Sequence, residues 1–163
     1  MDSKPCIWSY VVVHDKGSAP CVDDNLLSLC ICKPLIRRSA KVGDWLIGFA
    51  RKKVGSNLII YIAEITKKIS MKEYFMDQNP RLDKIYNVVG DKLIHYGGEI
   101  HNNPKNWKTD LSGEYCLISE NYKYFGNSPI SNIEELYDLY HPYVGQKKTK
   151  KEKYIYDLKK FFN

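Results

Sequence analysis

The stretch CKPLIRRSAKVGDWLIGFA, from Cys32 to Ala50, contains the strongest structural signals of this sequence. Its Gly43-Asp44 pair is typical of a tight turn, because glycine tolerates unusual backbone angles and an aspartate side chain accepts hydrogen bonds from nearby backbone amides. The apolar residues that follow at alternate positions predict a strand over residues 45–50. Gly48 lies on the other face of this strand, where it leaves room for a bend, a ligand or a neighbouring backbone.

The same stretch begins with positive charge. Lys33, Arg37 and Arg38 precede the turn, and such a group favours an anionic ligand, with a phosphate as the first choice. A basic surface loop ahead of an ordinary core strand explains the same residues equally well.

The charge of the whole chain gathers in two regions. The chain has 163 residues, 44% of them hydrophobic, and a net charge of +6, which together predict one domain with one core. Residues 33–53 carry seven basic side chains against Asp44, and residues 146–163 carry seven lysines against two acids. The rest of the chain is mildly acidic. This distribution fits anionic ligands at particular places better than a uniformly basic coat that binds nucleic acid.

The five cysteines show no paired spacing, and the apolar run at 7–13 is too short for a leader and resembles a strand. We therefore expect reduced cysteines and a soluble cytoplasmic protein. Nothing approaches the roughly 18 consecutive apolar residues of a membrane helix.

Local patterns predict the remaining elements. Residues 26–32 are compatible with a strand or with a helical turn, and residues 87–108 predict a long irregular segment. Ser70 and Glu73 form a capping-box pattern at the start of a short helix. The other predicted elements are strands at 7–13, 45–50, 57–66 and 114–119, a helix opened by Ser131, and an amphipathic helix at 150–163 with a lysine-rich outer face.

Cysteine chemistry has two interpretations besides burial. The pair Cys30-x-Cys32 does not have the spacing of a standard zinc module, so we expect no metal. Cys32 is a candidate nucleophile, since Lys33 and Arg37 favour a thiolate and His14 or His95 could serve as the base. Phosphate-binding glycine loops of the nucleotide hydrolases and dinucleotide folds are absent from the sequence.

A binding pocket explains the polar and aromatic residues best. Basic side chains would hold a phosphate, an aromatic ring would stack on a base, and polar groups would contact the edge of the base. Trp45 and Tyr124 are also explained by packing. The candidate ligand-binding residues are Asp15, Gly17, Lys33, Arg37, Trp45, Arg51, His95 and Tyr124.

Several blocks of the chain resemble a known family, the nucleotide modification associated domains of bacteria and phages, and most of all their second type. The most specific blocks are the CKPxIR motif at 32–37 and the GDW motif at 43–45. The resemblance spans residues 7 to about 130 and leaves out the tail after about 145. Residues 23–27 and 95–107 depart from the family pattern.

More remotely, the chain is similar to PUA-like modules of the EVE and YTH type. This similarity implies an α+β fold, namely a small, partly open β-barrel with flanking helices that holds a modified base in an aromatic-lined pocket. We expect the barrel at residues 1–145, with the lysine-rich C-terminal helix at 146–163 packed on it or extending from it.

The resemblance implies that the protein binds a nucleotide or a modified base without transforming it and without a cofactor. The context would be nucleic-acid modification or defence in phages and bacteria, in the cytoplasm of the host cell, with a nucleotide or modified nucleic acid as partner. One alternative is sequestration or sensing of a soluble nucleotide signal. Another is an enzyme that acts on a nucleotide or base, with Cys32, His95 or Asp15 as participants.

Overall fold

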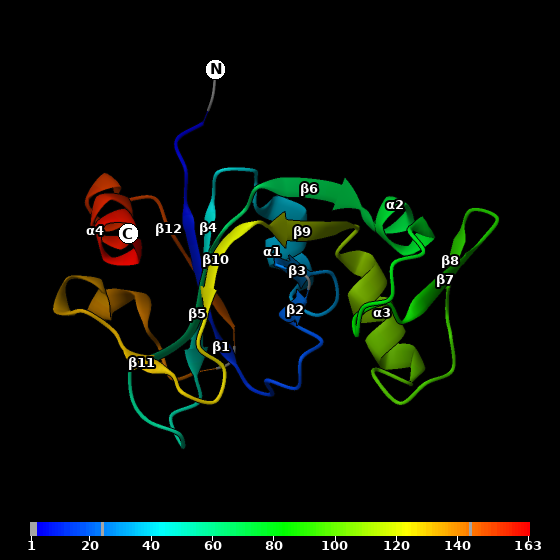
Figure 1. Ribbon diagram of the computed structural model, residues 1–163, viewed down its shortest axis with the longest axis horizontal. Coiled ribbons are helices and arrows are strands. Elements are labelled where there is room, and N and C mark those ends of the chain that lie inside the picture. The colour runs from blue at the N-terminus through cyan, green and yellow to red at the C-terminus, as the bar shows by residue number, and fades with distance from the viewer. Residues whose placement is uncertain (1–2, 24, 144) are drawn as a thin grey trace. The chain divides into compact units, whose positions relative to one another are not determined.

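The computed structural model describes residues 3–23, 25–143 and 145–163, and it has a mixed α+β fold with two compact units (Figure 1). The first unit contains the residues up to Asp15, Ala40–Thr66 and Glu120–Asn163. The second unit contains Lys16–Ser39 and Lys67–Ser119. The chain therefore passes between the units several times, and the predicted single core becomes two.

The first unit is built on a six-stranded sheet with the order β10-β5-β4-β1-β12, to which β11 adds by pairing with β5. Only β1 and β4 run parallel among these pairs. The strands are β1 (Ile7–Val12), β4 (Trp45–Ala50), β5 (Leu58–Glu64), β10 (Asn121–Tyr124), β11 (Ile130–Ser131) and β12 (Gln146–Thr149). The predicted strands at 7–13 and 45–50, and the hairpin that joins 45–50 to 57–66, are confirmed.

Two helices pack on the apolar face of this sheet. They are the 3-10 helix η1 (Glu134–Leu139) and the C-terminal helix α4 (Glu152–Phe162), whose buried residues join the core of β1, β4 and β5. The predicted C-terminal helix is thus confirmed from residue 152, after β12 has paired with β1. The helix predicted to open at Ser131 begins at Glu134, because Ser131 is in β11.

Asp44 of the GDW motif connects the start of β4 to the start of β1 by hydrogen bonds. Gly43 has φ of 94°, the left-handed region that glycine adopts without strain. The buried Asp44 carboxylate accepts hydrogen bonds from the Lys41 amide at 3.0 Å, the Cys6 amide at 2.9 Å and the Trp8 indole at 3.1 Å. The predicted turn is confirmed, and one carboxylate also positions β1 beside β4.

Gly48 lies between two tyrosines across the sheet. In the strand register, Gly48 pairs with Tyr10 of β1 on one side and with Tyr61 of β5 on the other. The two tyrosine hydroxyls are hydrogen-bonded at 2.5 Å, and a Cβ at Gly48 would overlap the Tyr61 ring. The missing side chain therefore makes room for a neighbouring side chain, not for a ligand or a backbone.

The second unit has a four-stranded antiparallel sheet with the order β2-β3-β9-β6 and a separate hairpin, β7-β8. Its strands are β2 (Cys21–Asp23), β3 (Leu26–Leu29), β6 (Lys67–Ser70), β7 (Tyr86–Val89), β8 (Lys92–His95) and β9 (Tyr115–Ser119). Its helices are α1 (Pro34–Ser39), α2 (Met71–Met76) and α3 (Pro104–Ser112). Residues 26–29 are therefore a strand, which settles the alternative left open for 26–32.

The prediction of an irregular segment at 87–108 is wrong. The hairpin β7-β8 turns at Gly90, and α3 starts within the same segment, where the Asn103 side chain accepts a hydrogen bond from the Asn106 amide at 2.9 Å. Asparagine, glycine and proline act here as a helix cap, a turn and a first helical residue. The Ser70 cap of α2 is confirmed, with its hydroxyl accepting from the Glu73 amide at 3.1 Å.

The α+β class is confirmed, whereas the PUA-like fold is not. Over the described ranges there are five helices and several sheets, and none of these sheets closes into a barrel. In the described parts of the chain, no helix is both long enough and apolar enough to cross a membrane.

Candidate active site

The eight predicted ligand-binding residues are divided between the two units. Neither unit alone contains the whole predicted pocket, and the binding roles of these residues stay predictions. Asp15, Trp45, Arg51 and Tyr124 belong to the first unit, and Gly17, Lys33, Arg37 and His95 belong to the second.

In the first unit, Asp15 and Tyr124 lie together. The Tyr124 hydroxyl donates to Asp15 Oδ2 at 2.5 Å, and burial, followed by this hydrogen bond, raises the pKa of Tyr124. Trp45 is in the core, where its ring packs edge-on against Phe162 with the ring centres 5.1 Å apart. Arg51 is exposed at the end of β4. Trp45 therefore has the packing role that its sequence pattern also allowed.

Arg37 is fully buried in the second unit. Its guanidinium donates to three backbone carbonyls, those of Cys32 at 2.6 Å, Asp110 at 2.6 Å and Tyr115 at 3.1 Å. Gly113 leaves space for it, since a Cβ there would overlap the guanidinium carbon. Arg37 thus joins the loop before α1 to the end of α3 and the start of β9, and this placement gives its predicted phosphate contact no support.

The other predicted residues of the second unit lie in loops or at strand ends. Gly17 has φ of 87° and is in a bend, and Lys33 directly follows Cys32 and is partly buried, which lowers the pKa of its ammonium group. His95 is at the end of β8, where its Nε2 lies 2.7 Å from the Ile100 carbonyl and its Nδ1 accepts from the Gly97 amide at 3.0 Å. Both ring nitrogens of His95 are therefore occupied.

Cys32, His101 and Asp110 form a continuous chain of close polar contacts in the second unit. The Cys32 Sγ lies 3.3 Å from His101 Nε2, and His101 Nδ1 lies 2.7 Å from Asp110 Oδ2. Cys32 is in the loop between β3 and α1, His101 is in the loop after β8, and Asp110 is in the last turn of α3. A thiol, an imidazole and a carboxylate in this order are the arrangement of cysteine-dependent enzymes.

The Asp110 carboxylate holds this arrangement in place. Asp110 is only 1% exposed, and its Oδ1 accepts a hydrogen bond from the Cys32 amide at 2.8 Å. Its Oδ2 accepts a second hydrogen bond, at 2.7 Å, from the Tyr86 hydroxyl, as well as contacting His101. One buried carboxylate therefore fixes both the backbone of Cys32 and the ring of His101.

The electrostatics of the group favour a charged imidazole. The Asp110 hydrogen bond, followed by the contact with Cys32, raises the pKa of His101 to about 10. At neutral pH His101 is thus an imidazolium, which donates from Nδ1 to the carboxylate and from Nε2 toward the sulfur. Cysteine reacts as a nucleophile in its thiolate form, and this imidazolium lies beside the Cys32 sulfur.

The backbone around these residues is unusual. Cys32, Lys33 and His101 have φ angles of 60°, 42° and 52°, in the left-handed region that side chains other than glycine seldom adopt. Such conformations persist only where surrounding contacts impose them, and they gather at functional sites. Here the Asp110 carboxylate and the Arg37 guanidinium are the contacts that hold the Cys32 loop.

The same three side chains lie close enough to be considered as metal ligands. The two imidazole nitrogens, however, face different neighbours, with Nε2 toward the sulfur and Nδ1 toward the carboxylate. Each ring nitrogen thus already has one polar neighbour in this orientation. The geometry suits proton transfer along a line better than a shared metal ion.

The sequence pointed to Cys32 but not to its partners. His95 and His14 were the candidate bases, whereas the histidine beside the sulfur is His101, 69 residues from Cys32 along the chain. Asp110 lies 78 residues from Cys32. No local motif links positions so far apart, so the pattern of residues contained no signal for this pairing.

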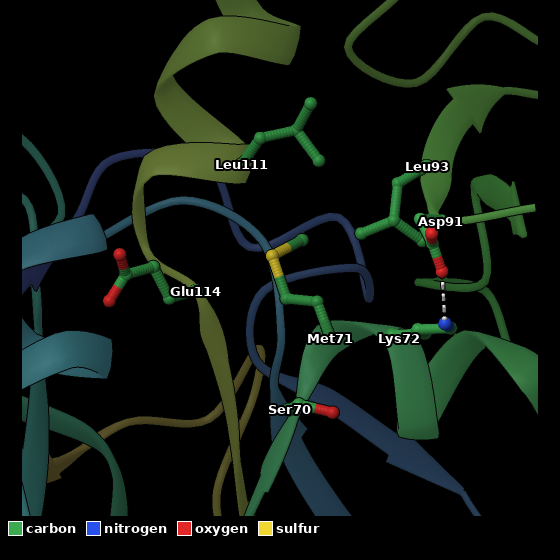
Figure 2. Close-up of a pocket in the computed structure, with 7 residues that line it drawn as sticks. All are labelled: Ser70, Met71, Lys72, Asp91, Leu93, Leu111 and Glu114. Carbon is green, nitrogen blue, oxygen red and sulfur yellow. Dashed lines mark hydrogen bonds and ion pairs between the residues drawn. The ribbon is translucent and has the colours of Figure 1, made fainter.

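A groove of 370 Å³ lies in the same unit, as shown in Figure 2. Met71, Leu93 and Leu111 give it an apolar lining, and the Lys72–Asp91 ion pair of 2.9 Å lies at its side. Met71 Sδ also accepts a hydrogen bond from Arg37 at 3.5 Å, and Leu111 directly follows Asp110. The groove thus shares structural support with the Cys32 loop, and it contains none of the predicted ligand-binding residues.

The family of the chain follows from comparison with known sequences. The chain matches nucleotide modification associated domain 2 over residues 4–103 and 83–163. This match includes the tail after residue 145, which the resemblance alone had left out. No curated protein and no solved structure is found to match the chain. The two matched segments together cover nearly all of it, so the chain belongs to the nucleotide modification associated domain 2 family.

Proposed function

We propose that this protein is an enzyme of nucleotide modification in which Cys32 is a covalent nucleophile. The observation that carries the proposal is the contact chain from Cys32 Sγ through His101 to the buried Asp110. Membership of the family supports a nucleotide or a base as the substrate. Among the functions that the sequence left open, the enzyme has more support than binding without chemistry.

The chemistry that suits these groups is acyl transfer. In the first step, the Cys32 thiolate attacks the carbonyl carbon of an amide or ester group on the substrate, and a bond between sulfur and carbon forms. The bond from that carbon to the leaving nitrogen or oxygen breaks. His101 gives its Nε2 proton to the leaving group, while its Nδ1 proton stays on the Asp110 hydrogen bond.

In the second step, the thioester is resolved. A water molecule or an amine loses a proton to His101 Nε2 and attacks the thioester carbon, and the sulfur leaves as a thiolate. The imidazolium is restored, and the net reaction is hydrolysis with water or transfer of the acyl group with an amine. Asp110 keeps the ring and the Cys32 backbone in place in both steps, because its Oδ2 contacts the His101 ring and its Oδ1 accepts from the Cys32 amide.

Lys33 keeps its predicted role for an anionic part of the substrate. It directly follows Cys32, and its partly buried ammonium is beside the reacting sulfur in the chain. A phosphate or carboxylate on the substrate would be attracted there.

The test uses p-nitrophenyl acetate as an acyl donor, with mass spectrometry to locate the acetyl group. We expect acetylation at Cys32, because Cys6, Cys21, Cys30 and Cys116 are buried. Cys32→Ser should abolish the modification, and His101→Asn should slow it by about 100-fold or more, the usual contribution of a positioned acid or base. Cys6→Ser is the matched control and should react like the wild type.

Two results would contradict the proposal. One is acetylation spread over all cysteines at similar rates, and the other is an unchanged rate in a folded His101→Asn protein. Nucleotides with amide or ester groups on the base then replace the probe, to identify the natural acyl donor.

A second candidate function is base recognition by Asp15 and Tyr124. Asp15 Oδ1 is buried and has no hydrogen-bond partner among the described residues, while Oδ2 is bound to the Tyr124 hydroxyl. A carboxylate oxygen of this kind accepts from the exocyclic amine of a base, and an adjacent ring can stack on it. Asp15→Asn should then weaken binding of cytidine or adenosine nucleotides in a calorimetric titration more than binding of uridine nucleotides, and equal effects would refute the assignment.

A further inference from the structure

We infer that the exposed face of α4 binds single-stranded nucleic acid, so that the substrate is presented within a polynucleotide. This face, called the α4 face below, consists of Lys153, Tyr156, Lys159 and Lys160. The part of this inference that concerns the substrate rests on the proposed function, because it assumes that the protein acts on a nucleotide. Its observations come from the first unit, however, and do not involve Cys32.

The orientation of α4 leaves this face in solvent. Ile155, Leu158 and Phe162 are buried in the core of the first unit, which directs the opposite side of the helix outward. Tyr156 on that side is 66% exposed. A large aromatic side chain so exposed does not contribute to the core and is available to a partner.

The lysines of the α4 face surround this ring. Lys153 precedes Tyr156 by three positions, and Lys159 and Lys160 follow it by three and four, the spacings at which helical side chains are neighbours. All three lysines are exposed. In the described parts of the chain, no ion pair or side-chain hydrogen bond engages their ammonium groups, and with Asp157 as the acid between them along the helix, the face keeps a net positive charge.

Several other charged side chains nearby already have partners. Glu152, one turn before Tyr156, is ion-paired with Lys4, and the Lys147 ammonium donates to the Asp138 carbonyl. Lys148 lies over the Trp8 ring, 4.8 Å from its centre, and Lys151 lies 5.4 Å from the centre of the Tyr154 ring. Unlike those of Lys147, Lys148 and Lys151, the ammonium groups of the α4 face make no hydrogen bond, ion pair or ring contact among the described residues, so they can meet an external anion.

A single strand is the partner that uses both parts of this surface. Phosphates pair with the lysines, and an unpaired base stacks on the tyrosine ring. In a duplex the base faces are covered by their neighbours, so an exposed ring gains nothing from stacking. An acidic peptide would use the lysines but would have no need of the ring.

The test measures the binding of fluorescein-labelled oligothymidylate of twelve nucleotides by anisotropy, from low to physiological salt. We expect Tyr156→Ala to weaken binding by at least about fivefold, the lower end of the effect of losing one stacked base. Lys153→Ala/Lys160→Ala should reduce the slope of log affinity against log salt by about 1.4, from two lost phosphate contacts at about 0.7 each.

The matched control is Lys52→Ala/Lys53→Ala, which removes the same charge from an exposed loop of the same unit. This control should keep the affinity within about twofold of the wild type, if the effect belongs to a site and not to net charge. Cys32→Ser should bind as well as the wild type, which separates this inference from the proposed catalysis. Tyr156 and the substituted lysines are exposed, so these variants should fold.

Three results would overturn the inference. They are equal losses in the two double-lysine variants, unchanged affinity in Tyr156→Ala, and equal or tighter binding of a duplex of the same length. Competition by poly-glutamate at concentrations like those of the oligonucleotide would point to an acidic protein partner and would also refute it.

Discussion

Replacing Arg37 by alanine should destabilise the protein severely. Arg37 is fully buried, and its guanidinium is the hydrogen-bond donor for the carbonyls of Cys32, Asp110 and Tyr115. Removing it leaves three carbonyls without this donor and opens a cavity of side-chain size. Each buried acceptor that loses its partner costs about 1–3 kcal/mol, so a total loss of about 3–5 kcal/mol is expected after partial relaxation.

Urea unfolding followed by tryptophan fluorescence measures this loss. With a slope of about 2 kcal/mol per molar, the midpoint should fall by about 1.5–2.5 M. Arg37→Lys keeps the charge but cannot reach three carbonyls in a fork, so it should recover only a small part of the stability. Arg38→Ala is the neighbouring control, because Arg38 is exposed and, among the described residues, donates to one carbonyl, that of Ser112 at 2.8 Å.

The reasoning would be refuted by a folded Arg37→Ala protein within about 1 kcal/mol of the wild type, the size of an ordinary exposed contact. It would also be refuted if Arg38→Ala cost as much as Arg37→Ala. A stable Arg37→Ala protein with weakened nucleotide binding would instead restore the phosphate contact that the sequence predicted.

Three further predictions concern the sheet and the candidate site. Asp44→Ala should lower the free energy of unfolding by about 2–4 kcal/mol, because the Cys6 and Lys41 amides and the Trp8 indole lose their acceptor; Asp91→Ala, on an exposed pair, is the control for urea unfolding. Gly48→Ala should cost about 1–3 kcal/mol by overpacking against Tyr61, whereas Gly55→Ala meets only the flexible end of Leu58. The His101 pKa of about 10 lies above its unfolded value of about 6.5, so the stability that His101 contributes is fully present below pH 6.5 and is lost as the pH rises to 10. The difference in unfolding free energy between the wild type and His101→Gln should therefore shrink over that pH range, and a constant difference would contradict the assignment.

The sequence predicted those elements whose signals are local. The strand at 45–50, its hairpin with 57–66 and the capped helix at 71–76 follow from alternation, a turn and a side-chain cap within a few residues. The hairpin β7-β8 and helix α3 were missed because Gly90, Asn103 and Pro104 are equally typical of irregular loops. Their actual roles depend on the packing of α3 and the hairpin with the second-unit core.

For the candidate site, the sequence offered Cys32 as one candidate nucleophile with His14 or His95 as its base, whereas the histidine beside the sulfur is His101. The charge of Arg37 suggested an anionic ligand, yet the buried guanidinium donates to backbone carbonyls instead. A sequence cannot distinguish an arginine that faces solvent from one that lies inside, since both have the same chemistry. The difference becomes visible only in the folded structure, where Gly113 leaves space for the Arg37 guanidinium inside the unit.

The sequence by itself determined the strand at 45–50, the GDW turn and the amphipathic C-terminal helix, because periodicity and turn chemistry act over one or two turns of chain. Only the tertiary structure decided that His101 and Asp110 meet Cys32, and that Arg37 supports the loop that carries Cys32. Cys32 is 69 positions from His101 and 78 positions from Asp110, so their contacts form only when separate elements pack. The free energy that selects these contacts belongs to the folded unit as a whole.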